Sequence, residues 1–351
     1  MNYFQYNQPF ELEGGQTLPE ITIAYHTFGQ LNAKKSNVVW ICHALTANSN
    51  VLDWWDGLVG ENKAMDPDKH FIVCANILGS CYGSTGPLSV NPETQQPYYN
   101  TFPQVTIRDM VKAHILLREH LGLEKIHILA GGSCGGYQVL EWAVAEPEVA
   151  ENLFLLATSA AESTWGIGIH TTQRLMLEAD GTWGEPSPTA GSKGLKAARA
   201  LGILTYRNYQ ILAQNQTDPD PEKLENHRVS SYLNYQGDKL VARFNAYSYW
   251  FLTKALDSHH LGRGRGGRLE PVLQKIAQKT LIIGISSDIL CPVQEQQFLA
   301  QHLPNATYVE IDSNYGHDGF IIEGEKISKH FSAWLAEVED EKLAPSPAVP
   351  L

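Results

Sequence analysis

The feature that most constrains the fold is a series of short segments made almost entirely of apolar residues. Four of them lie in the first half of the chain, at residues 38–42, 71–75, 126–130 and 154–157. Strands without polar alternation are typical of a parallel sheet that is covered on both faces. Between the second and third segments, residues 107–121 place apolar side chains at helical spacing, as a crossover helix would. This alternation predicts an α/β fold with a mostly parallel, doubly wound sheet.

The middle of the chain breaks this alternation. Residues 162–268 are polar, rich in Tyr and helical in pattern, and strand character returns at 280–285 and 306–311. Because the late strands need partners from the first half, we predict one sheet interrupted by an inserted helical lid. The final residues have no core pattern and are expected to be disordered. The predicted parts are a core of residues 1–161 and 269–338, a lid of residues 162–268 and a disordered tail of residues 339–351.

Composition excludes several classes of protein. The 38 acidic and 26 basic residues give a net charge of −12, which argues against a general nucleic-acid surface but leaves room for a small basic patch. No apolar run approaches the roughly 18 residues of a membrane-spanning helix, and residues 1–13 show no secretory signal. The five cysteines form no CxxC pair, which is typical of a reduced protein. We therefore expect a soluble, cytoplasmic protein.

A motif of the form G-x-S-x-G occupies residues 131–135. It follows the apolar segment 126–130 and precedes a helical run at 137–145, so Ser133 falls in a sharp turn between a strand and a helix. This arrangement is the nucleophile elbow of serine enzymes, in which glycines avoid collisions with the neighbouring strand and helix. A plain glycine-rich turn and a phosphate-binding loop are the alternatives, and the Cys134 thiol is an alternative nucleophile. Because Ser133 occupies the apex, we predict that it is the nucleophile.

A serine nucleophile needs a base, and the base needs a carboxylate that orients it. In folds with this elbow the three residues follow the order Ser, Asp or Glu, and His. Asp288 follows the strand at 280–285 and His317 follows the strand at 306–311, so both fall at the carboxyl end of the sheet. A helix cap at Asp288 and an ordinary loop histidine at His317 are the alternatives. We predict a catalytic triad of Ser133, Asp288 and His317.

The backbone amides of Leu45 and Cys134 are predicted to form an oxyanion hole. Cys134 follows the nucleophile at a helix N-terminus, and Leu45 lies in the loop after the first apolar segment. Among the thirteen histidines, neither the adjacent pair His259 and His260 nor His43 has the i, i+4 spacing of helical zinc sites. No metal and no resident cofactor are therefore expected.

Several ordered motifs make the chain similar to one known family. They extend over nearly its whole length and comprise residues 42–46, 83–87, 102–111, 131–136, 141–143, 173–174, 205–207, 231–233, 235–239, 287–288 and 315–318. On these motifs the chain resembles the homoserine O-acetyltransferase family of α/β-hydrolase-fold enzymes. The resemblance implies an α/β-hydrolase fold with a helical lid.

The resemblance also implies a ping-pong acyl transfer in methionine biosynthesis. Ser133 would take an acyl group, most simply acetyl, from acyl-CoA as co-substrate and pass it to the hydroxyl of homoserine. His317 would act as base and then as acid in each half-reaction, and Asp288 would hold its tautomer. Arg174 matches the family arginine that binds the amino-acid carboxylate, and Asp318 matches the acid that meets the ammonium group. Without the resemblance, Arg174 and Asp318 would be ordinary surface charges.

The chain departs from the family pattern at five positions. Cys134 and Tyr137 stand where the family usually has Met, Ser230 replaces a usual Glu, and Asn245 and Tyr247 replace Asp and Asn. These departures leave open whether the acyl group is acetyl or succinyl and whether the acceptor is homoserine or serine. A lidded serine esterase and a non-catalytic binding protein on the same fold are further alternatives.

The expected partners are small molecules, namely homoserine and acyl-CoA. Neither a nucleic acid nor a membrane is expected to bind. The Tyr-rich lid predicts a homodimer that pairs through this surface.

Overall fold

An eight-stranded sheet forms the centre of the computed structural model, which describes residues 1–343. The strand order is β1 (Asn2–Tyr6), β4 (Ile21–Phe28), β6 (Phe71–Ala75), β5 (Val38–Cys42), β9 (Ile126–Gly132), β10 (Ala150–Leu156), β11 (Lys279–Ile285) and β12 (Ala306–Ile311). From β6 to β12 neighbouring strands run parallel, and β1 and β4 add antiparallel strands at one edge. The predicted α/β fold is confirmed, and the late strands join the sheet where β11 pairs with β10.

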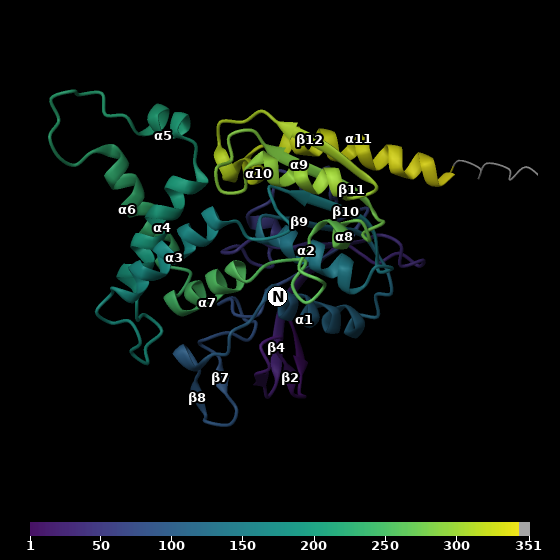
Figure 1. The fold of residues 1–351 in the computed structure, drawn as a ribbon, viewed down its shortest axis with the longest axis horizontal. Coiled ribbons are helices and arrows are strands. Elements are labelled where there is room, and N and C mark those ends of the chain that lie inside the picture. Colours follow the sequence, from purple (N-terminus) through teal and green to yellow (C-terminus); the bar gives the residue numbers. More distant parts are fainter. Residues whose placement is uncertain (344–351) are drawn as a thin grey trace, which may run out of the picture.

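Helices lie around this sheet, and shorter elements complete the core (Figure 1). The core helices are α1 (Ile107–His120), α2 (Cys134–Ala145), α8 (Glu270–Leu273), α9 (Val293–His302), α10 (Gly319–Ile322) and α11 (Gly324–Leu343). The short elements are strands β2 (Phe10–Glu11), β3 (Thr17–Leu18), β7 (Val90–Asn91) and β8 (Gln96–Pro97), and 3₁₀ turns η1 (Val51–Asp53), η2 (Tyr99–Thr101) and η3 (Gly316–Asp318). Within residues 1–343, no helix has both the length and the apolar character needed to cross a bilayer.

The apolar segments of the sequence are strands that lie between two hydrophobic cores. All five residues of β5 are buried. Trp40 belongs to the core that α1 and α2 cover, while Val39 and Ile41 belong to the core that α11 covers. On the α11 side, the rings of Phe331 and Phe154 pack with centroids 4.7 Å apart. Because side chains alternate between the two faces of a strand, burial on both faces requires an apolar residue at every position.

Five helices are inserted between β10 and β11, and we call residues 164–257 the helical insertion. They are α3 (Thr164–Glu178), α4 (Ser192–Tyr206), α5 (Tyr209–Gln216), α6 (Arg228–Val241) and α7 (Ala246–Asp257). In Figure 1 they form the teal and green group beside the sheet. α4 packs against α3 and α6, and α3 packs against α7. All five helices fall inside the range predicted for the lid.

The predicted disordered tail begins too early. Helix α11 continues through Leu343, and Lys279 forms an ion pair of 2.7 Å with Glu341. This helix buries Ile327, Phe331 and Val338 against the sheet. Its last turn continues the helix but adds no apolar residues at core spacing, so the sequence pattern does not reveal it. The prediction is therefore wrong for residues 339–343, and residues 344–351 lie outside the described part of the chain.

Candidate active site

Ser133 occupies a strained turn between β9 and α2. Its backbone has φ 54° and ψ −129°, a conformation that side chains rarely adopt outside functional sites. A Cβ on Gly135 would lie 2.1 Å from the carbonyl oxygen of Cys42, and one on Gly131 would lie 2.4 Å from the backbone of Gly135. The glycines of the motif thus let α2 approach β5 closely, which fixes Ser133 at the apex of the turn.

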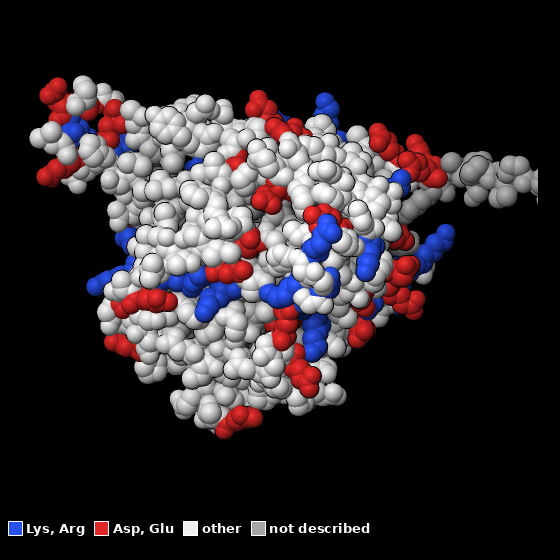
Figure 2. Space-filling model, viewed as in Figure 1, with Lys and Arg blue, Asp and Glu red and all other residues white. Residues whose placement is uncertain are grey.

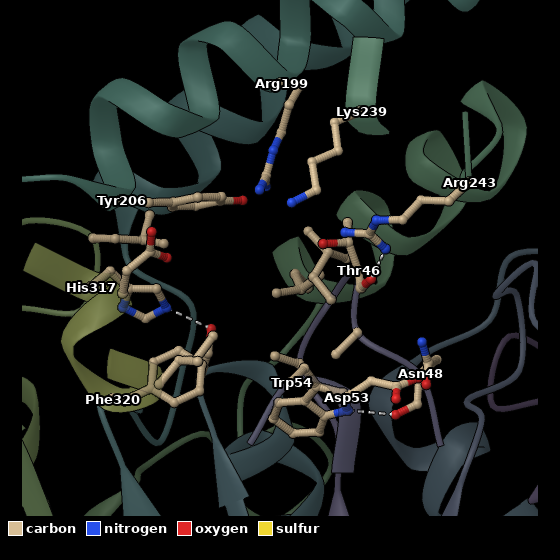
Figure 3. Close-up of a pocket in the computed structure, with 18 of the residues that line it drawn as sticks. Thr46, Asn48, Asp53, Trp54, Arg199, Tyr206, Lys239, Arg243, His317 and Phe320 are labelled. Atoms are coloured by element: carbon tan, nitrogen blue, oxygen red, sulfur yellow. Dashed lines mark hydrogen bonds between the residues drawn. The ribbon is translucent and has the colours of Figure 1, made fainter. Parts of the chain in front are cut away.

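The structure brings Ser133, His317 and Asp288 together in one hydrogen-bonded chain. His317 Nε2 lies 2.9 Å from Ser133 Oγ, and His317 Nδ1 lies 2.6 Å from Asp288 Oδ2. Figure 3 shows the first of these bonds as a dashed line. The other Asp288 oxygen accepts hydrogen bonds from the amides of Leu290 and Cys291, at 2.8 and 2.9 Å, which fixes the carboxylate. The three residues meet because β9, β11 and β12 end at the same edge of the sheet.

The environment of His317 favours a proton on its ring. Burial alone would lower the pKa of His317, but the charge and the hydrogen bond of Asp288 raise it, and the net pKa lies above its ordinary value. With Nδ1 facing the carboxylate, Nε2 is the ring atom that faces the Ser133 hydroxyl. This arrangement suits a base that must take a proton from the serine and carry it briefly.

The amides of Cys134 and Leu45 are the predicted donors of the oxyanion hole. Cys134 is the first residue of α2, where backbone N–H groups have no partner within the helix, and Leu45 lines the same cavity as Ser133. Among the described residues, neither amide donates a hydrogen bond to a neighbour. The Cys134 thiol lies 3.8 Å from the carbonyl oxygen of His43, and burial raises its pKa to about 12. A buried thiol of this kind is a poor nucleophile, so the geometry favours Ser133.

A cavity of about 400 Å³ opens above Ser133 and His317. The sheet core supplies one wall, which includes Trp54 and Phe320, and the helical insertion supplies the opposite wall. In Figure 3 the side chains of Arg199 and Lys239 extend from the insertion into the cavity. Ser133 and His317 therefore come from the core, whereas the cationic side chains Arg199 and Lys239 come from the insertion.

Arg174 is not among the residues that line this cavity. Its Nη2 lies 2.5 Å from Asp257 Oδ2, so the guanidinium is engaged between α3 and α7. Arg199 on α4 lines the cavity instead. The geometry thus does not support the prediction that Arg174 meets the substrate, and sequence reasoning missed Arg199. A usable signal was present in the sequence, because Arg199 lies two helical turns before Tyr206 of the matching motif 205–207, so the two side chains share one helix face.

Asp318 lies beside His317 in the cavity wall. It forms an ion pair of 2.9 Å with Arg207. Burial raises the pKa of Asp318, and the charges of Arg207, His317 and Arg199 act in the opposite direction without reversing the shift. Arg199 and Asp318 therefore present one cation and one acid near the nucleophile, the pair of charges that a zwitterionic amino acid requires.

The five departures from the family pattern lie outside the cavity wall. Tyr137 donates a hydrogen bond of 3.1 Å to Glu162 and stacks on His259 with ring centroids 4.1 Å apart. Asn245 caps α7, and Tyr247 is buried with its hydroxyl bonded to a backbone carbonyl. Ser230 is exposed on α6, and Cys134 is buried. Four of the departures are buried outside the cavity wall, and Ser230 is on the surface.

One group of potential metal ligands occurs among the residues that the structure describes. It consists of Asp288, Cys291 and His317, whose ligand atoms lie within 4.8 Å of one another. Burial raises the pKa of the Cys291 thiol well above its usual value, which disfavours the thiolate that a metal needs. A metal ion bound there would also compete with the hydrogen bond between Asp288 and His317. The donor set therefore fits the triad better than a metal centre.

Sequence comparisons relate the chain to known proteins. The pattern of the alpha/beta hydrolase fold matches residues 37–323. A homoserine O-acetyltransferase of Cyclobacterium marinum is 52% identical over 335 residues, which cover 95% of each chain. One of Trichormus variabilis is 44% identical over 324 residues, covering 92% of this chain and 90% of the relative.

Solved structures share the fold at lower identity. A homoserine O-acetyltransferase of Bacillus anthracis aligns with a TM-score of 0.87 at 24% identity, covering 95% of this chain and 96% of its own. Esterase E22 aligns with a TM-score of 0.86 at 23% identity, covering 95% and 99%. The fold is thus common to transferases and esterases and does not choose between them. By its sequence, along nearly its whole length, the chain belongs to the homoserine O-acetyltransferase family of alpha/beta-hydrolase-fold enzymes.

Proposed function

We propose that the protein transfers an acetyl group from acetyl-CoA to the hydroxyl of L-homoserine, a reaction of methionine biosynthesis, through an acyl-serine intermediate. The observation on which this proposal rests is the hydrogen-bonded chain of Ser133, His317 and Asp288 at the floor of a charged cavity. The names of the relatives at 44–52% identity support the choice of substrates.

In the first half-reaction, Ser133 Oγ attacks the thioester carbonyl while its proton passes to His317 Nε2. The amides of Leu45 and Cys134 stabilise the oxyanion that forms. Collapse of this intermediate breaks the carbon–sulfur bond, and His317 gives its proton to the leaving thiolate. Free CoA and an acetyl ester of Ser133 result, and Asp288 stabilises the transient imidazolium.

In the second half-reaction, the homoserine hydroxyl takes the place of the serine hydroxyl. Its proton passes to His317 as its oxygen attacks the ester carbonyl, and His317 returns a proton to Ser133 Oγ when the ester breaks. Arg199 is proposed to hold the carboxylate of the acceptor, and Asp318 its ammonium group. Acetyl-CoA enters as a co-substrate, so this scheme requires neither a metal nor a resident cofactor.

The proposal includes a cytoplasmic homodimer that pairs through the helical insertion. Three large side chains of the insertion are strongly exposed, namely Tyr209 at 84%, Leu224 at 89% and Tyr235 at 62%. Burial of such residues against a second copy would remove apolar surface from water. Light scattering at micromolar concentration tests this point, and a monomeric mass would contradict it.

The function is tested by a matrix of two donors and two acceptors. Acetyl-CoA and succinyl-CoA are each combined with homoserine and serine, and the release of free thiol is followed. We expect rapid release only with acetyl-CoA and homoserine. Equal release with and without homoserine would identify an esterase, and preference for another pair would replace the proposed donor or acceptor.

A further inference from the structure

The insertion wall of the cavity carries a concentration of positive charge that contrasts with the rest of the chain. The whole sequence has a net charge of −12, and on the face drawn in Figure 2 basic and acidic side chains lie intermingled. Arg199, Lys239 and Arg243 all line the cavity from the insertion. Of the acidic residues in the lining, Asp318 is paired with Arg207, and Asp53 accepts a hydrogen bond from the neutral Asn50 and so offsets only one of the three cations. The wall therefore presents excess positive charge to a ligand.

Lys239 has an exposed ammonium group that extends into the cavity beside Arg199 (Figure 3). No hydrogen bond or ion pair joins this ammonium to any residue that the structure describes. The adjacent carboxylate, Asp238, is instead paired with Lys196 at 2.8 Å. Lys239 thus keeps its full charge available inside the cavity.

Arg243 is held in place by neutral groups. Its Nη1 donates to the carbonyl oxygen of Thr46 at 2.5 Å and to the hydroxyl of Tyr82. Neither acceptor neutralises the guanidinium, and within the described residues its Nη2 has no hydrogen-bond partner. The side chain is therefore positioned without being compensated, as a binding group should be.

Lys239 lies in the last turn of α6, and Arg243 follows the C-cap of this helix, Ala242, which keeps a helical conformation. Both side chains line the cavity, and Figure 3 shows them reaching toward it. Like charges that face one cavity repel each other, and within residues 1–343 neither of these two cations forms an ion pair with a carboxylate. A ligand with two adjacent negative charges would offset this repulsion, and a diphosphate has this form.

We infer that Lys239 and Arg243 bind the diphosphate of the acyl donor while its thioester reaches Ser133 at the floor of the same cavity. This inference rests on the proposed function and extends it, because it assigns the part of the donor that the insertion recognises. Arg199 and Asp318 are left for the amino-acid acceptor. The two cations then separate phosphorylated donors from simple acetyl esters, which carry no charge for them to bind.

Kinetics of charge-neutral variants test this assignment. Lys239→Gln and Arg243→Gln should each raise the KM for acetyl-CoA by about tenfold, and the double variant by more, since a charge-assisted bond at a partly exposed site contributes on the order of 1.4 kcal/mol. The KM for homoserine, and the rate with uncharged p-nitrophenyl acetate as donor, should remain unchanged. Lys196→Gln is the matched control, because this lysine lies on α4 and pairs with Asp238; it should leave all three quantities unchanged.

A donor without the 3′-phosphate identifies the group that is bound. With acetyl-dephospho-CoA, which keeps the diphosphate, the double variant should still show its raised KM. Disappearance of the effect with this donor would overturn the diphosphate assignment, as would an unchanged KM for acetyl-CoA in the double variant or an equal loss with both acetyl-CoA and p-nitrophenyl acetate. A wild-type protein that fails to release thiol with acetyl-CoA and homoserine would instead refute the proposed function itself.

Discussion

Ser133, Asp288 and His317 reach the cavity from the ends of strands in one sheet, whereas Arg199, Lys239 and Arg243 reach it from the helical insertion. Hydrogen bonds and burial fix the first group, while Lys239 and Arg243 in the second are exposed and uncompensated by acids. The difference indicates a division of labour. In the proposed mechanism, the sheet edge holds the groups that make and break bonds, and the insertion recognises the substrates.

If this division is correct, the largest effect comes from the sheet edge. Ser133→Ala should lower kcat by about 10³-fold or more, because the alanine variant cannot form the acyl intermediate. Thiol release from acetyl-CoA measures it. Cys134→Ala is the control, since it keeps the backbone amide and should retain activity. Near-normal turnover in Ser133→Ala, or a loss only in Cys134→Ala, would contradict the assignment of the nucleophile.

Stability should follow the same contrast. Phe331→Ala, which empties a position packed on Phe154 beneath the sheet, should lower the free energy of unfolding by about 3–5 kcal/mol. Leu224→Ala in the insertion, where the side chain is 89% exposed, should change it by about 0.5 kcal/mol or less. Urea denaturation monitored by tryptophan fluorescence compares the two. Similar losses would mean that the insertion is as tightly packed as the core.

The comparison is sharpened by two arginines of the insertion. Arg199→Ala should raise the KM for homoserine by about 10- to 100-fold, because the homoserine carboxylate loses the guanidinium proposed to bind it. Arg174→Ala should leave this KM nearly unchanged and reduce stability instead, because Asp257 loses its ion pair. Steady-state kinetics and thermal unfolding of both variants separate these effects. A larger change in homoserine KM for Arg174→Ala would restore the assignment made from the sequence.

The smallest expected effect is on the pH profile. His317 must be neutral at Nε2 to take the serine proton, so kcat/KM should fall as the pH drops through the pKa of His317. Because Asp288 raises this pKa, the acid limb should lie above pH 6.5, the ordinary value. Measurement of kcat/KM for acetyl-CoA from pH 5 to 9 locates the acid limb. A limb below pH 6.5 would mean that burial of His317 outweighs the carboxylate.

The same two regions differ in how far the sequence predicts them. Strands with a core on each side leave continuous apolar segments, and the turn at Ser133 admits only glycine at its tightest contacts, so the sheet and the triad could be located from local patterns. The insertion carries polar residues on several helix faces, and only packing decides that Arg199 meets the cavity while Arg174 meets Asp257.

The contact partners of Tyr137 also lie far from it in the sequence and could not be predicted from local patterns. Tyr137 could be recognised as unusual, but its contacts with Glu162 and His259 depend on how β10 and α7 come back to α2. The end of α11 was missed for a different reason. Its last turn is stabilised by continuity with a buried helix and by one ion pair, neither of which produces an apolar pattern.

The pairing of β10 with β11 across the insertion has a consequence for synthesis on the ribosome. Ser133, the proposed nucleophile, is translated before the insertion, and His317, its proposed base, only afterwards. A nascent chain therefore exposes the open edge of β10 until Lys279 and the residues after it emerge. The backbone groups of such an unpaired edge strand gain their hydrogen-bond partners slowly, and until then the edge is prone to associate with other chains. Catalytic competence is therefore among the last properties that the growing polypeptide acquires.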